Sequence, residues 1–185
     1  MKKMLFIVPV ILLSACAGKS QMQTFMEANT DADTKYFVQD PSVKLTDVCP
    51  STGFMTESEL ISEFSKQIKT VVCNEKKCAE NAKSDNVIVI APKIEYRKTF
   101  MGEGVSCNES YANSSTKYSF DLIKGGKVVY TKPMSNELVP QRSVFGNLGR
   151  IATQLSFSGG PENERNDIGN HTNGIAERIL EDLNK

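Results

Sequence analysis

Tryptophan is absent from this chain, and histidine occurs once, at His171. The lack of indole rings disfavours an aromatic platform for carbohydrate. The polar run around His171 predicts a solvated loop just before the last helix. A catalytic histidine needs a nucleophile and an orienting acid, and no Gly-x-Ser-x-Gly motif supplies the serine. We therefore expect a protein that is not an enzyme, and a hydrolase is the least favoured class.

Motifs for cofactors and metals are missing as well. The glycines at 102–104 and 146–149 lack the Lys-Ser/Thr ending of a phosphate loop. Asp31, Asp33 and Asp40 do not follow the spacing of a calcium loop. We expect no cofactor and no bound metal.

The formal net charge is zero, because 22 Lys and Arg residues balance 22 Asp and Glu residues. No basic patch stands out, so nucleic acid is not an expected partner. The apolar run from Met4 to Leu13 is far shorter than the about 20 residues that span a bilayer. It follows Lys2 and Lys3 and precedes small residues, which is typical of a cleavable secretory signal.

The end of this signal, Leu13-Ser14-Ala15-Cys16, resembles the lipobox of bacterial lipoproteins. In that family the cysteine thiol carries a diacylglyceryl group, the signal is cut before it, and the new amine is usually acylated, for example with palmitate. The resemblance implies that residues 1–15 are removed and that Cys16 is the lipid attachment residue. Ala17 replaces the aspartate that often retains such proteins in the inner membrane, which implies an outer-membrane anchor facing the periplasm. The alternative is an ordinary signal peptide with a cysteine near its cleavage site.

The four remaining cysteines are Cys49, Cys73, Cys78 and Cys107. An even number in an exported protein indicates two disulfides, with three pairings open. A local Cys73–Cys78 loop would leave Cys49–Cys107, and the chain-entropy model gives about 2 kcal/mol for the short link and about 4 kcal/mol for the long one. A metal site is disfavoured because the Cys73–Cys78 spacing is wider than CxxC and the histidine is distant.

The segment behind the anchor is polar and predicts a flexible tether over residues 16–35, followed by one domain over residues 36–185. Within the tether, Met22, Phe25 and Met26 have the spacing of one amphipathic helical turn, but a partly ordered linker is the favoured interpretation.

The domain begins with a strand near 36–38 or 43–48, and Pro41 separates the two candidates. Thr56 and Glu59 form the signature of a capping box. The helix behind it has an apolar stripe and a charged outer face; the stripe consists of Leu60, Ile61, Phe64, Ile68, Val71 and Val72.

The β-branched run 87–90 predicts a buried strand that continues toward Phe100. A long loop is expected over residues 101–116, then a half-buried strand near 118–122 and a hairpin turn at Gly125-Gly126. Because long loops in compact domains are functional or mobile, Tyr111, Asn113 and Ser114 are the candidate binding residues.

The C-terminal part contains a short helical pattern over 144–155 and a polar segment over 156–173 that includes the breaker Gly159-Gly160-Pro161. Ile175, Ile179 and Leu183 then have the spacing of a final helix. The order of elements predicts an α+β fold: a small antiparallel or mixed sheet, two or three helices on one face, and disulfide bracing. This arrangement resembles small envelope-lipoprotein domains.

These features predict a non-catalytic, outer-membrane-anchored lipoprotein that serves an envelope assembly, with the membrane and an envelope protein as partners. The alternative is a periplasmic lipoprotein that binds a small molecule, glycan or peptide. An assembly component should expose an apolar patch or a sheet edge, whereas a binding module should have a concave pocket.

Overall fold

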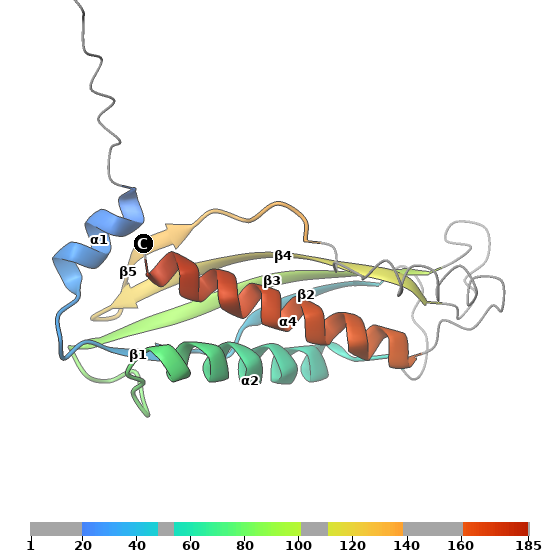
Figure 1. Cartoon of the computed structure of the whole chain (residues 1–185), viewed down its shortest axis with the longest axis horizontal. Coiled ribbons are helices and arrows are strands. Elements are labelled where there is room, and N and C mark those ends of the chain that lie inside the picture. Colours follow the sequence, from blue (N-terminus) through green and yellow to red (C-terminus); the bar gives the residue numbers. More distant parts are fainter. Residues whose placement is uncertain (1–19, 48–53, 101–110, 139–160, 185) are drawn as a thin grey trace, which may run out of the picture.

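The computed structural model describes residues 20–47, 54–100, 111–138 and 161–184. They form three helices and a mixed five-stranded sheet, which confirms the predicted α+β fold. Two long helices, α2 (Glu57–Glu75) and α4 (Pro161–Leu183), pack side by side on one face of the sheet. The short helix α1 (Gln21–Asn29) lies at one end of it (Figure 1).

The sheet is built around its two longest strands, β3 (Val87–Phe100) and β4 (Tyr111–Lys124), which pair antiparallel. Both β1 (Lys35–Val38) and β2 (Ser42–Asp47) pair parallel with β3, one after the other along the same side. Both candidate first strands are therefore present, separated at Pro41 as predicted. The last strand, β5 (Lys127–Lys132), pairs antiparallel with β4 and ends the sheet on the opposite side.

The turn between β4 and β5 consists of Gly125 and Gly126, with φ of 56° and 74°. Positive φ at both central positions is the requirement of a tight hairpin turn whose twist matches the strands. The predicted hairpin is thus confirmed.

Helix α2 (Glu57–Glu75) begins at the predicted capping box, in which Thr56 and Glu59 satisfy each other's backbone N–H groups. Its outer face carries Glu63, Lys66 and Lys69, all exposed. Its inner stripe is fully buried at four positions, which are Leu60, Phe64, Ile68 and Val72.

Helix α4 (Pro161–Leu183) contains Ile175, Ile179 and Leu183 in its buried stripe, as predicted, but it begins much earlier than expected. Pro161 does not break the helix; it is its first residue, a position where its missing N–H and fixed φ are favourable. The helix continues through Gly169 and Gly174. The polar segment over 156–173 is therefore helical from residue 161 onward, and the pattern at 144–155 lies outside the described residues.

Helix α1 (Gln21–Asn29) corrects the prediction of a flexible tether over residues 16–35 in its described part, and residues 16–19 lie outside that part. Ser20 caps it in a second capping box, together with Gln23. Met22, Phe25 and Met26 are buried and belong to the main core cluster. The three apolar residues form the amphipathic turn that the sequence analysis noted, and their burial holds α1 against β5 and α4.

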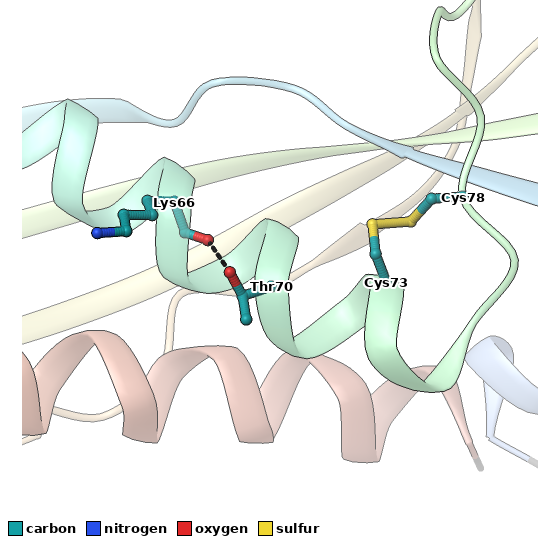
Figure 2. The surroundings of a disulfide bond; sticks show 4 residues. All are labelled: Lys66, Thr70, Cys73 and Cys78. Carbon is teal, nitrogen blue, oxygen red and sulfur yellow. Dashed lines mark hydrogen bonds between the residues drawn. A yellow bond between two sulfur atoms is a disulfide. The ribbon is translucent and has the colours of Figure 1, made fainter.

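The Cys73–Cys78 disulfide braces the end of α2, as predicted for the short loop (Figure 2). It holds the segment around Cys78 beside β1. There the backbone N–H of Tyr36 donates to the carbonyl of Lys77 at 2.8 Å, and the backbone N–H of Ala79 donates to the carbonyl of Tyr36 at 2.8 Å. One turn earlier, the Thr70 hydroxyl donates to the Lys66 carbonyl at 2.8 Å. Cys49 and Cys107 lie outside the described residues.

Candidate functional site

The described part of the predicted binding loop, from Tyr111 onward, belongs to strand β4, and residues 101–110 lie outside the described residues. Tyr111 pairs with Phe100 at the start of β4, and Asn113 and Ser114 follow within the same strand. Ser114 is fully buried on the side of the sheet that faces the helices. The prediction of a loop over 101–116 is therefore wrong from residue 111 onward, because polar residues are stable in a strand when one face meets water and the other finds polar partners.

The partner of Ser114 is His171, which the sequence analysis placed in a solvated loop. His171 lies within α4 and is only 3% exposed. Its Nε2 atom is 3.0 Å from the Ser114 hydroxyl, and its Nδ1 atom is 2.9 Å from the Thr116 hydroxyl. The Tyr96 ring meets the imidazole edge-on, with 6.0 Å between ring centroids. The prediction of a solvated His171 is thus wrong.

The Ser114–His171 distance equals that of a nucleophile and its general base, but the surroundings differ from a catalytic triad. A triad places a carboxylate at the second imidazole nitrogen, where this chain places the hydroxyl of Thr116. Ser114 and Thr116 are both 0% exposed. This arrangement satisfies polar groups within the core and leaves no open approach to Ser114.

A buried ion pair lies at the same end of the core. Lys98 and Glu164 are 2.9 Å apart, with side chains 2% and 0% exposed. Both also bind the backbone of Met55. The Lys98 ammonium donates to the Met55 carbonyl at 2.6 Å, and the Met55 N–H donates to the Glu164 carboxylate at 2.8 Å. The pair therefore fixes the chain just before the cap of α2 to both β3 and α4.

Sequence reasoning missed this polar cluster because it searched for apolar periodicity. The buried positions of α4 keep helical spacing along its whole length, but in its first half all of them except Ile168 are polar. These are Glu164, Asp167, His171 and Thr172. Their spacing, continuous with Ile175 and Ile179, was the available signal.

Two surface hollows adjoin the helices. One, of about 410 Å³, lies between the first turns of α2 and α4; it is lined by Met55, Glu59, Ser62, Glu63, Arg165, Ile168 and Gly169. The other, of about 420 Å³, lies among α1, β1 and the ends of α2 and α4, and includes Met26, Tyr36 and Lys76.

The face of the sheet opposite α2 and α4 carries mainly charged and polar side chains along β2, β3 and β4. Side chains alternate across a strand, and the buried positions of β3 from Ile94 onward face the helices. No described helix covers this face, which is called the uncovered face below. The register aligns Lys44 with Glu95 and Glu95 with Lys117 on it. Among the described side chains of these three strands, the charged residues on this face are Lys44, Lys93, Arg97 and Lys117, against Glu95 and Asp121.

Asp121 is held in its charged form on this face. Burial raises the pKa of Asp121, but hydrogen bonds from Lys93 and Thr131 and the charge of Lys93 outweigh it, so that the net pKa is lowered. The Lys93 ammonium lies 2.7 Å from the carboxylate, and the Thr131 hydroxyl donates to it at 2.8 Å.

The β5 edge, which comprises Val128 and Val129 of β5 and Met134 two residues beyond its end, is the most apolar exposed region of the described chain. Val128, Val129 and Met134 are 57%, 39% and 43% exposed, and they are the exposed large apolar residues among the residues described. Val128 also ends a row of apolar residues that crosses the uncovered face through paired positions of four strands, namely Phe37, Val89, Ile123 and Val128.

Within the described ranges, no helix is long and apolar enough to cross a membrane. The same ranges contain no group of three or more His, Cys, Asp or Glu side chains placed to hold a metal ion. Cys16 and the lipobox precede residue 20 and lie outside the described part.

No protein-family model and no curated protein matches the chain. A solved structure from Helicobacter pylori, described as a neuraminyllactose-binding hemagglutinin homolog, is similar with a TM-score of 0.41 and 10% sequence identity. The match covers 84% of this chain and 86% of that chain. A likeness of this degree carries no argument about function.

Proposed function

We propose that this protein is a non-catalytic lipoprotein, anchored in the outer membrane through Cys16, whose domain docks a protein partner in the periplasm on the uncovered face of its sheet. The observation that carries the proposal is the charge of that face. Four basic side chains stand against two acidic ones among the described residues of β2, β3 and β4, which favours an acidic partner surface.

The placement of the helices supports the same function. Among the described residues, both long helices cover one face of the sheet, and the main core cluster includes the buried stripes of both helices. Lys44 and Arg97 are exposed on the uncovered face, and a lipid anchor would raise the concentration of this face near other membrane-bound proteins.

A ligand-binding lipoprotein is the second candidate function. It is favoured by the hollow of about 410 Å³ between α2 and α4. Its lining includes the apolar Met55 and Ile168 and the charged Arg165, Glu59 and Glu63. Small-molecule sites use this mixture of apolar lining and a few polar groups.

The first proposal is tested by in-cell crosslinking of the native protein, followed by mass spectrometry of the crosslinked complexes. We expect a discrete set of envelope proteins, and Lys44→Glu should reduce its yield several-fold. Lys66→Glu is the matched control, because Lys66 is exposed on the outer face of α2. Equal crosslinking by the two variants would contradict docking on the sheet face, and no partner above background would favour the ligand-binding function.

A further inference from the structure

The distance between the proposed lipid anchor and the folded domain is very short. Helix α1 begins with its cap at Ser20, so only four peptide units separate Cys16 from the folded part. A chain of that length reaches at most about 14 Å. Because Met22, Phe25 and Met26 are buried in the core, α1 cannot act as a longer tether unless that burial is lost.

The part of the domain beside α1 is therefore held at the membrane surface. Helix α1 contacts β5 and α4 (Figure 1). It is also joined to the β4–β5 hairpin by Lys124, whose ammonium donates to the carbonyl of Asn29 at 2.8 Å. The apolar side chains of the β5 edge are thus on the region that the anchor holds closest to the lipid.

We propose that the β5 edge rests on the membrane that carries the anchor, with Val128, Val129 and Met134 entering the interface. This inference rests on the proposed anchor at Cys16 and adds the orientation of the domain. It assigns lipid as the occupant of the three exposed apolar residues of the β5 edge.

The composition of the edge fits a shallow contact with lipid headgroups. Lys127 and Lys132 lie at the two ends of β5. Lys127 is exposed, and Lys132 is held by Asp182 at 2.5 Å. An open sheet edge has backbone N–H and C=O groups that need hydrogen-bond partners. Such partners are absent from the hydrocarbon layer but present among hydrated headgroups. The strand therefore lies at headgroup depth, where a lysine meets lipid phosphates and three apolar side chains reach the acyl boundary.

A single introduced tryptophan tests the contact, because the chain contains none. Lipidated Val129→Trp protein is purified from membranes and reconstituted in vesicles of phosphatidylethanolamine and phosphatidylglycerol that contain a nitroxide-labelled lipid. We expect the label to quench its fluorescence several-fold more strongly than that of Lys66→Trp, the matched control on the outer face of α2.

Equal quenching of the two variants would overturn the proposal, as would a photocrosslinker at position 129 that captures a protein rather than lipid. Val128→Trp, with the same expectation, replaces Val129→Trp if its circular dichroism shows that it does not fold. Vesicle flotation separates this inference from the proposed function: protein that does not float lacks the anchor, whereas floating protein without selective quenching has the anchor and a different orientation.

Discussion

At the scale of single residues, the fold depends on a few buried polar side chains as well as on its apolar core. The side chains of Lys98 and Glu164 are shielded from water, and together they bind the backbone carbonyl and N–H of Met55. His171 similarly ties Ser114 and Thr116 of β4 to α4. Each of these groups is stable only while its partners are present, because an unsatisfied buried polar group is costly.

Glu164→Gln should lower the free energy of unfolding by about 3–5 kcal/mol, because it leaves the buried Lys98 ammonium without its carboxylate. Urea denaturation of the variant and the parent measures the difference. Glu162→Gln is the matched control, since Glu162 is exposed in the same turn of α4. Equal destabilisation by both variants would show that the helix end, and not the ion pair, determines the effect.

The carboxylate of Asp121 should contribute to the pH dependence of stability. Its pKa in the folded protein lies below the ordinary value of 3.8, so its stabilisation is present above that value and is lost as the pH falls through the folded pKa. Asp121→Asn should therefore flatten the loss of stability on the acid side, measured as the urea midpoint from neutral pH down to about pH 2. An unchanged acid limb would indicate that other carboxylates determine it.

At the scale of elements, replacing a glycine by alanine should change stability in opposite directions at two positions. Gly169 is an exposed helical residue of α4, and a Cβ placed there meets no atom within 4 Å. Gly125 also has free space, but its φ of 56° is in the left-handed region that disfavours other residues.

Gly169→Ala should stabilise the protein by about 0.5–1 kcal/mol through helix propensity, whereas Gly125→Ala should destabilise it by about 1 kcal/mol through backbone strain. Thermal unfolding of the two variants measures both effects. A loss of stability in Gly169→Ala would mean that a neighbouring segment packs against that helix position.

The elements also show what the sequence could predict. The capping box of α2, the strand from Val87 and the Gly125-Gly126 turn each depend on local chemistry, and all three are confirmed. The early start of α4 and the strand beginning at Tyr111 depend on which polar groups meet across the core. His171 is buried because Ser114 and Thr116 lie opposite it, and nothing adjacent in the sequence states that pairing.

At the scale of the whole molecule, its attachment to the membrane and the second of its two expected disulfides remain predictions of the sequence. The lipobox residues and two of the cysteines lie outside the described part. The Cys73–Cys78 disulfide is present, and the pairing of Cys49 with Cys107 is the expectation that follows for an exported chain.

Cys16→Ser should abolish lipidation and release the protein from membranes, because no other acyl attachment residue is expected. Fractionation of cell membranes, followed by immunoblotting, measures the change. Ser14→Thr, which leaves the cysteine in place, is the control. Full retention of Cys16→Ser in the membrane fraction would show that the lipobox interpretation is wrong.

The mature protein should contain no free thiol if both predicted disulfides form. Alkylation under denaturing, non-reducing conditions, followed by intact-mass measurement, counts the reactive cysteines. Modification of Cys49 and Cys107, with Cys73 and Cys78 protected, would contradict the predicted Cys49–Cys107 disulfide and support the Cys73–Cys78 disulfide alone.

The parallel pairing of β1 and β2 with β3 has a consequence for how the chain is assembled. Both early strands leave the ribosome before β3, which is their partner strand within the described ranges, since all of α2 lies between Asp47 and Val87. Apart from the bonds of Tyr36 to Lys77 and Ala79, the described strand partner of β1 and β2 is β3, and pairings over such sequence distances form slowly. Unpaired strands are prone to aggregate, so the pairing with β3 should protect β1 and β2 from contacts with other chains.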